Sequence, residues 1–455
     1  MIPMALRNKK LQEQSQMKKY IDEIKNMKQF LLLWSTQAFS ALGSAMTSYA
    51  LVIWSYTQEG SALITALLMV CSYAPYVLLS IFAGALSDRW NKKRTMLFCD
   101  LMAALTTFTV LFLLKTGRLV IWHLYAINAV NGLMNTVQQP ASEVATTLVL
   151  PKENYQRAGG LKALSNSVNS ILTPILATAI MGLLGIDAVI VFDIVTFLAA
   201  FTVLLFFIKI PDEEKREESK THVFTAAKEG IAWLRKNRGI FDLILFLAAI
   251  NLVASMYNAA FPAMMISRQG GSEFAMGVVN TVIGVGSLLG GIAASVMKAP
   301  KSRVKMVCNT LLISMSTENF LLALGRSLPV WCIGGFLGWF LIPIMNANLG
   351  AVMRLNIPKE IQGRVYACRN SLQFFTIPLG YFLGGFLVDN VFEPFMAQRG
   401  INSLFIRLFG SGKGSGAALF FFFIAFLGVA VCLYFRRSPH IRALEESELK
   451  GGTDI

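Results

Sequence analysis

Charged residues are scarce in this sequence. They make up 15% of the 455 residues, whereas 55% are hydrophobic. Soluble globular domains carry about 25% charged residues, which cover their surface. The shortage of charge excludes an ordinary soluble domain and indicates that lipid surrounds most of the chain.

Cysteine pairs and nucleotide-binding loops are missing as well. The 6 cysteines lie in or beside apolar runs and not as pairs in polar segments, so we expect neither a disulfide framework nor a metal site. Residues 410–416 read G-S-G-K-G-S-G, but the earlier glycine that a phosphate-binding loop requires is absent, and no strand is expected before them. There is no catalytic triad spacing either. The sequence therefore supports neither an enzyme nor an ATP-driven pump, and we expect no cofactor.

Twelve apolar runs fill most of the chain instead. A helix needs about 20 residues to cross the roughly 30 Å hydrocarbon core of a bilayer, and each run is long enough. The runs are 29–56, 60–86, 95–114, 119–147, 159–183, 187–208, 240–267, 274–297, 305–324, 328–352, 364–389 and 416–435. They predict an all-α membrane protein with both termini on the same side of the membrane, because twelve is an even number.

The basic residues set the expected orientation. The chain has 41 Lys and Arg against 26 Asp and Glu, a net charge of +15 that would suggest nucleic acid in a soluble protein. Here the cations gather between apolar runs. With the amino terminus inside the cell, seven of the 41 lie outside and the other 34 inside. This asymmetry follows the positive-inside rule, so we expect a multi-pass cell-membrane protein with cytoplasmic termini and no nucleic acid partner.

Polar segments divide the chain into five parts. We expect a cytoplasmic amino-terminal segment at 1–28, a first six-helix bundle at 29–208, a cytoplasmic linker with an amphipathic helix at 209–239, a second six-helix bundle at 240–435 and a cytoplasmic tail at 436–455. The first segment lacks the apolar core of a secretory signal. Met17 could serve as the start of the chain, and function is not expected to depend on residues 1–16.

An internal repeat supports the two halves. The sequence P-K-E that begins at Pro151, after the fourth run, recurs at Pro358, after the tenth run, an offset of 207 residues. Similar halves at such an offset are typical of transporters built from two parallel repeats.

The sharpest functional signal is the hydrophilic hinge Gly84–Arg94, G-A-L-S-D-R-W-N-K-K-R, between the second and third runs. Its cations mark a cytoplasmic turn. The hinge resembles the loop motif G-x-L-a-D-r-x-g-r-k between helices 2 and 3 of the major facilitator superfamily. The matching residues are Gly84, Leu86, Asp88, Arg89, Lys92 and Lys93, with Asn91 in place of the usual glycine. The resemblance implies twelve transmembrane helices in two pseudo-symmetric bundles. It also implies a gating role for Asp88, which in that family bonds across the interface between the halves.

Further segments resemble the macrolide-efflux branch of the drug:proton antiporters within this superfamily. They extend over nearly the whole chain and comprise Trp34, Gln37, Ala38 and Ser40, then Gln139-Pro140-Ala141, Leu150–Glu153, and Asp193 with Thr196 and Phe197. Two features depart from that branch. Residues 391–416 are longer than we expect, and Thr173 stands where antiporters carry a glycine before the proline.

Polar side chains recur at helical spacing within several apolar runs. Residues three and four apart share one face of a helix, and a polar face should not meet lipid. The resemblance implies that helices 1, 4, 7 and 10 line a central cavity, and these runs carry polar stripes. We expect the substrate cavity to be lined by Gln37, Ser40, Ser44, Asn128, Asn131, Asn135, Gln138, Asn251, Asn258, Asn346 and Asn348. The alternative is that these amides and hydroxyls only hold helices together.

Two acids lie deep within apolar runs and are the candidates for proton coupling. They are Asp193 in the sixth run and Glu318 in the ninth run. A carboxylate is costly to keep charged in a low-dielectric environment, so such a group can carry a proton. The alternative is that each acid is paired or reaches water at a helix end. The fourth run has no Arg, which many proton-coupled relatives carry there, so the coupling mechanism stays open.

These features predict a secondary active transporter that exports an apolar or amphipathic small molecule, such as a macrolide-like drug, in exchange for protons. The two bundles would give alternating access. Its partners are the small-molecule substrate, protons and the lipid bilayer, and we expect a monomer. A lipid or siderophore carrier of the same fold is one alternative. A non-transporting membrane receptor or scaffold is another, although a scaffold does not need the polar stripes.

Overall fold

The computed structural model describes residues 27–150, 154–210, 223–358, 361–400 and 402–451. Within these ranges the side chains of 80–89, 155–157, 223–227, 363, 367 and 447–451 are not described. Every regular element in the described ranges is a helix.

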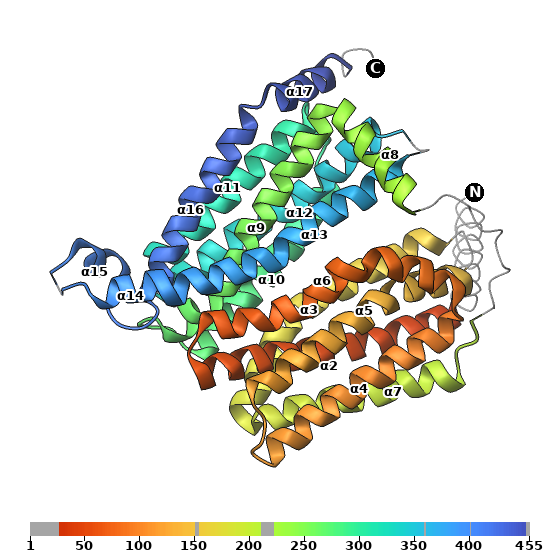
Figure 1. Cartoon of the computed structure of the whole chain (residues 1–455), viewed down its shortest axis with the longest axis horizontal. Helices are drawn as coiled ribbons and strands as arrows, with labels where there is room; N and C mark the ends of the chain where they lie inside the picture. The colour runs from red at the N-terminus through yellow and green to blue at the C-terminus, as the bar shows by residue number, and fades with distance from the viewer. Residues whose placement is uncertain (1–26, 151–153, 211–222, 359–360, 401, 452–455) are drawn as a thin grey trace, which may run out of the picture.

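Twelve of the described helices have at least 21 residues and form two halves (Figure 1). The first half comprises α2 (Lys28–Glu59), α3 (Ala62–Arg89), α4 (Lys92–Lys115), α5 (Ile121–Val149), α6 (Tyr155–Leu184) and α7 (Ile186–Phe206). The second half comprises α9 (Arg238–Ser267), α10 (Glu273–Val296), α11 (Arg303–Leu324), α12 (Leu328–Asn356), α13 (Gln362–Leu387) and α16 (Ser415–Arg436). We call the end where α2 begins and α16 ends the proximal end, and the opposite end the distal end.

Shorter helices lie between and beyond these long ones. They are α8 (Val223–Lys236), the π-helix η2 (Val388–Phe392), α14 (Glu393–Ala397), α15 (Leu404–Phe409) and α17 (Pro439–Gly451). The amphipathic helix α8 packs closely on α13, because a Cβ at Gly230 would lie 2.9 Å from the Arg364 carbonyl oxygen. The carboxylate of Asp242 holds α17 against α9, because it accepts from the Ser438 hydroxyl at 2.7 Å and contacts His440 at 2.9 Å.

The halves contact each other chiefly through two helix pairs, α3 with α13 and α6 with α10. Glycines on α10 allow this close contact with α6. If Gly277 carried a Cβ atom, it would lie 2.4 Å from the Thr178 hydroxyl, and a Cβ atom at Gly284 would lie 2.8 Å from the Ser170 carbonyl oxygen. Nearer the proximal end, a Cβ at Gly291 would meet no atom within 4 Å. The ribbons of the two halves diverge in the same direction (Figure 1). The halves are therefore closed at the distal end and separate toward the proximal end.

Eleven helices in the described part of the chain are long and apolar enough to cross a membrane. The twelfth long helix, α5, has 29 residues and crosses the first half like its neighbours, but it is less apolar than they are. The reason is its stripe of amide side chains, which faces the interior of the half, as described below. The fourth expected run is therefore present as a long helix that is less apolar than the other eleven.

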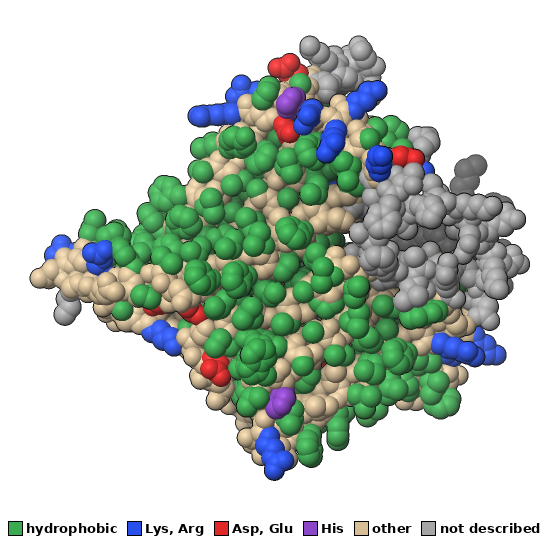
Figure 2. Space-filling view, in the orientation of Figure 1, with side chains coloured by type: hydrophobic (Ala, Val, Ile, Leu, Met, Phe, Trp, Pro, Cys, Tyr) green, Lys and Arg blue, Asp and Glu red, His purple; other side chains and the backbone are tan. Residues whose placement is uncertain are grey.

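Hydrophobic side chains cover much of both halves on the face that Figure 2 shows. Trp122 and Val296, for example, are each 78% exposed. Lys and Arg gather toward the ends of the molecule in the same view. An apolar belt between charged ends is the surface that a bilayer requires.

The hinge between α3 and α4 is shorter than the sequence suggested. Helix α3 continues to Arg89 and α4 already begins at Lys92, so only Trp90 and Asn91 separate them. The Asn91 side chain accepts a hydrogen bond from the Arg94 amide at 3.0 Å and so caps α4. Polar and charged residues at helix ends remain helical when a cap satisfies their amides, and composition alone does not indicate this.

Packing differs between the two halves. The second half has one continuous core that includes Trp331, Phe246 and Phe421, each with an exposed fraction of 0%. The first half has several smaller apolar clusters. One of them, around Leu68 and Leu124, lies toward the distal end, and another, around Met96 and Leu204, lies toward the proximal end. A polar cavity lies between these two clusters.

Glycine allows the closest helix approach in the second half. A Cβ on Gly286 would lie 2.9 Å from the Phe336 carbonyl oxygen, and one on Gly290 would lie 2.0 Å from that of Phe340. Helices in lipid gain little from the hydrophobic effect when they associate, so such close backbone contact supplies much of the attraction. The four-residue spacing of the two glycines places both on the face of α10 that meets α12.

Candidate functional site

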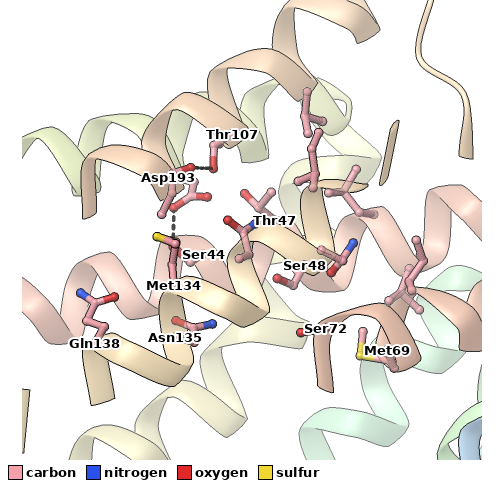
Figure 3. Close-up of a pocket in the computed structure, with 18 residues that line it drawn as sticks. Ser44, Thr47, Ser48, Met69, Ser72, Thr107, Met134, Asn135, Gln138 and Asp193 are labelled. Atoms are coloured by element: carbon pink, nitrogen blue, oxygen red, sulfur yellow. Dashed lines mark hydrogen bonds between the residues drawn. The ribbon is translucent and has the colours of Figure 1, made fainter. Parts of the chain in front are cut away.

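A polar cavity of about 160 Å³ lies inside the first half (Figure 3). Helices α2, α3, α4, α5 and α7 enclose it. Its polar lining consists of Ser44, Thr47, Ser48, Ser72, Thr107, Asn128, Asn131, Asn135, Gln138 and Asp193. Every one of these side chains comes from the first half, so the cavity belongs to one half and not to the interface between the two.

Asp193 is the acid of the cavity. It lies on α7 and is 3% exposed, and the Ser44 hydroxyl donates to its Oδ1 at 2.9 Å. The side chains of Thr47 and Thr107 lie beside the same carboxyl group (Figure 3). Asp193 takes part in none of the ion pairs among the described side chains. Hydroxyl groups can donate to a carboxylate or accept from a carboxylic acid, so this setting can bind both forms of the group.

The amide stripe of α5 forms one wall. Asn128 donates to the Leu124 carbonyl of its own helix at 2.8 Å, and Asn131 accepts from the Thr106 hydroxyl of α4 at 2.9 Å. Asn135 is exposed. Figure 3 shows Asn135 and Gln138 on the same side of α5. The stripe thus both holds α5 against α4 and leaves one amide accessible from outside the half.

A second acid lies at the proximal edge of the cavity. Asp100 on α4 is 9% exposed, and it accepts hydrogen bonds from Gln37 of α2 at 3.4 Å and from Gln138 of α5. This network joins three helices. Gln37 therefore belongs to the Asp100 network, and the cavity lining does not include it or Ser40, which is half-buried.

The polar residues expected in the second half lie apart from this cavity. Asn258 is the single exposed residue between Gly239 and Ser267 on α9. Helix α9 packs on α10, α13 and α16 of its own half and on α3 of the other half. Asn346 on α12 is exposed and Asn251 is half-buried. Asn348 is buried and donates to the Ile344 carbonyl of its own helix at 2.8 Å.

Aromatic side chains meet across the two halves between α3 and α13. Tyr73 stacks on Tyr381 with ring centroids 6.4 Å apart, and Tyr76 meets Phe374 edge to face at 4.9 Å. These pairs lie near the middle of the two helices.

Glu318 occupies a different environment from Asp193. It lies on α11 in the second half and is 4% exposed, and the Trp339 indole donates to its Oε1 at 3.1 Å. Gly338 packs directly on the carboxyl group, because a Cβ there would lie 2.3 Å from Oε2. The structure therefore does not bring the two expected proton carriers together.

Part of the hinge falls outside the described side chains, namely Gly84, Asp88 and Arg89. Lys92 is buried with an exposed fraction of 5%. Lys93 donates to the carbonyls of Leu205 at 2.9 Å and Ile208 at 2.7 Å. These carbonyls end α7, so this lysine satisfies acceptors that have no partner within the helix.

Sequence reasoning missed three hydroxyls of the cavity, those of Ser48, Ser72 and Thr107. Ser72 and Thr107 are the single polar contributions of α3 and α4 to the lining, so no periodic pattern signals them. Ser48 lies one turn beyond Ser44 on α2, and extending that stripe by four residues would have found it.

Comparisons with known proteins agree with this architecture. The Major Facilitator Superfamily model matches residues 33–317. Macrolide efflux protein A of Streptococcus pyogenes is 24% identical over 367 residues, which cover 80% of this chain and 90% of that protein. Multidrug efflux pump Tap of Mycolicibacterium fortuitum is 27% identical over 381 residues, which cover 79% and 89%. The crystal structure of the nucleoside transporter NupG has a TM-score of 0.62 at 13% identity and covers 90% of this chain and 99% of that one.

The family model spans more than half of the chain, and the helices that it covers form the first half and part of the second. Two halves of six long helices each, built for a bilayer, agree with this match. This chain belongs to the major facilitator superfamily and is a multi-pass membrane transporter.

Proposed function

We propose that this transporter exports an apolar or amphipathic small molecule across the cell membrane in exchange for protons. The observation that carries the proposal is the small polar cavity around the buried carboxyl of Asp193. Drug-sized ligands occupy pockets of about 300–1,000 Å³. A cavity of about 160 Å³ is too small for such a ligand but has room for about five water molecules. It therefore suits a proton or a hydrated ion and not the exported compound.

The exported compound would bind between the halves. Asn258 and Asn346 offer amides from the second half, and Asn135 offers one from the first half; all three side chains are exposed. The aromatic pairs between α3 and α13 would form the distal wall of this space. Aromatic walls with a few amides suit an amphipathic compound, because the rings bury apolar surface and the amides satisfy its polar groups.

Two side chains would connect the Asp193 cavity, where the proton binds, with the space between the halves, where the exported compound binds. Ser44 is an exposed residue of α2, yet its hydroxyl donates to the buried Asp193. Asn135 lines the cavity and is exposed as well. A change in the protonation of Asp193 would change the hydrogen bond with Ser44 and thereby the surface that faces the compound. This arrangement is the physical basis that we propose for coupling.

The proximal end would lie in the cytoplasm. The cations at the start of α4 and in the segments beyond α16 belong to this end, and lysine and arginine favour the cytoplasmic side. The present structure then corresponds to an inward-facing state. The two halves, joined by residues 209–239, would rock against each other as the two bundles. Asp88 of the hinge would hold the alternative, proximally closed state.

The names of two similar proteins agree with export. One is a macrolide efflux protein and the other a multidrug efflux pump. We infer that the substrate of this chain is a lipophilic compound of comparable character. We also propose that it acts as a monomer, because each chain would contain both halves of the pathway.

The test is efflux of a fluorescent lipophilic drug from energised membrane vesicles, with and without a protonophore. The proposal expects the protonophore to stop efflux. Asp193→Asn should lower proton-driven efflux at least ten-fold and make drug binding independent of pH, since this side chain can no longer change its charge. Glu318→Gln is the matched control, because it removes a buried carboxyl of the other half.

Uncoupler-insensitive efflux would reject proton coupling. Loss of coupling in Glu318→Gln with full coupling in Asp193→Asn would move the proton site to the second half. Absence of any flux, with intact folding, would favour a receptor or scaffold instead.

A further inference from the structure

One acid reaches across the halves at the distal end. Asp389 lies on the π-helix η2, which follows α13 in the second half. Its Oδ2 accepts from the Ser61 hydroxyl at 2.5 Å and from the Leu63 amide at 2.9 Å, and its Oδ1 accepts from the Ala62 amide at 3.0 Å. All three donors belong to the beginning of α3 in the first half.

This carboxylate caps a helix of the opposite half. The first amides of a helix have no partner within it, and the positive end of the helix dipole attracts a negative charge. Ser61 is the N-cap residue of α3, and its own Oγ accepts from the Ile64 amide at 3.1 Å. Hydrogen bonds to a charged acceptor are about twice as strong as neutral ones. Asp389 thus supplies three such bonds where the halves meet.

The backbones allow this contact because they approach closely. A Cβ on Gly385, one turn before Asp389, would lie 2.6 Å from the Leu63 Cα. Glycine is therefore required at this position for α13 to reach the start of α3. Asp389 itself lies in the π-helical turn η2, and such turns occur frequently at functional sites.

Other distal contacts are neutral or peripheral by comparison. The Tyr56 and Ser267 hydroxyls are 2.7 Å apart, and the exposed Thr57 donates to Glu273 at 3.2 Å. Each is a single hydrogen bond between two side chains. Asp389 instead binds backbone amides, whose positions are fixed by the helix.

We propose that Asp389 is the distal latch of the transport cycle, a carboxylate that holds the distal ends together in this state and releases α3 when the distal end opens. The proposal rests on the alternating-access cycle proposed above but on neither its substrate nor its coupling ion. Asp88, at the opposite end of α3, is expected to act in the opposite state. Helix α3 would therefore be held at one end in each of the two states.

The test measures the distance across the distal end by double electron–electron resonance between two spin labels. The labels are placed at Gln58 of α2 and Phe274 of α10, both exposed, in a chain whose six free cysteines have been replaced and which retains efflux. The variant is Asp389→Asn, which removes the charge and one acceptor. The control is Glu393→Gln. Glu393 also caps a helix, accepting from the Gly414 and Ala417 amides at 2.9 and 3.0 Å, but entirely within the second half.

If Asp389 holds the distal ends together, Asp389→Asn should raise the ratio of distally open to distally closed molecules about ten-fold or more, because charge-assisted hydrogen bonds are lost. Glu393→Gln should leave the ratio within two-fold of the parent. An unchanged distance distribution in Asp389→Asn, or an equal shift in Glu393→Gln, would overturn the proposal.

A second variant keeps the test decisive if Asp389→Asn does not fold. Ser61→Ala removes one donor to the latch from the other half and should shift the ratio in the same direction, whereas an unshifted ratio would contradict the latch. The distances are measured without substrate or proton gradient. A failure of the export proposal would therefore appear as absent flux with the latch effect intact.

Discussion

A single added methyl group should destabilise the second half at Gly290. The ideal Cβ position at this residue lies 2.0 Å from the Phe340 carbonyl oxygen and 2.8 Å from its carbonyl carbon. Ordinary contacts between such atoms begin at about 3.4 Å. Gly290→Ala therefore requires α10 and α12 to separate by roughly 1 Å or more, because both clashing atoms belong to the backbone and cannot rotate away.

The cost follows from the rigidity of this contact. Overpacking of a well-packed interior typically costs about 1–3 kcal/mol. The neighbouring Gly286 also packs closely on α12, so the strain is not relieved by tilting one helix around it. We expect Gly290→Ala to lower the midpoint of thermal unfolding by several degrees, measured by intrinsic fluorescence in detergent at a fixed heating rate.

Gly291 provides the matched control. It is the next residue of α10, and a Cβ there would meet nothing within 4 Å. Alanine is also a better helix former than glycine by about 1 kcal/mol. Gly291→Ala should leave the midpoint unchanged or raise it. If the two variants unfolded at the same temperature, the close approach of α10 and α12 would be refuted.

Three further predictions concern hydrogen bonds that single side chains make between helices. Lys93→Met should lower stability by about 1–3 kcal/mol, because the carbonyls at the end of α7 lose their donor, and Lys93→Arg should restore part of the loss in the same thermal assay. Burial lowers the pKa of Arg268 to about 10, so this side chain is still charged at neutral pH. It donates to two carbonyls at the end of α11, each at 2.8 Å. Arg268→Met should destabilise the protein by a similar amount, and an unfolding midpoint equal to that of the parent would contradict this. Trp339→Phe removes the donor to Glu318 and should lower the unfolding midpoint without changing the drug-to-proton ratio in vesicles; a changed ratio would implicate Glu318 in coupling.

The sequence predicted the long helices well, because a hydrophobic run of about 20 residues in so apolar a chain is typical of a membrane-spanning helix. The expected run 187–208 corresponds to α7 at Ile186–Phe206, for example. The hinge was harder to predict. Asn91 caps α4 through its side chain, so the charged residues after it are helical, although their composition is typical of a loop.

Helical periodicity in the sequence predicted part of the cavity lining but not all of it. Asn128, Asn131 and Asn135 repeat at spacings of three and four, and this periodicity places them on one face of α5, which the structure turns toward the interior. Thr107 is the single polar residue that α4 contributes to the lining, so no periodic pattern in the sequence signals it. Periodicity also gives the face of a helix but not its partner. The stripes of α5 and α9 therefore looked alike, although only the stripe of α5 lines the polar cavity.

The distal contact of Asp389 was not predictable for a related reason. The residue is the last of the expected run 364–389, and an acid at a helix end usually reaches water. Its partners lie more than 300 positions away in the sequence, in backbone amides that carry no side-chain signature. Only the arrangement of the two halves brings them together.

The central claim is that polar side chains between the halves border a space that opens to alternate sides of the membrane. The most direct test is labelling of Asn258→Cys, in the cysteine-free chain, with a membrane-impermeant thiol reagent applied to either face. The account predicts rapid reaction from the cytoplasmic face, slower reaction from the outer face, and protection by bound drug. Ala259→Cys, at a neighbouring position that is 2% exposed, should react from neither face. A cysteine at position 258 that stayed sealed from both faces would contradict the account.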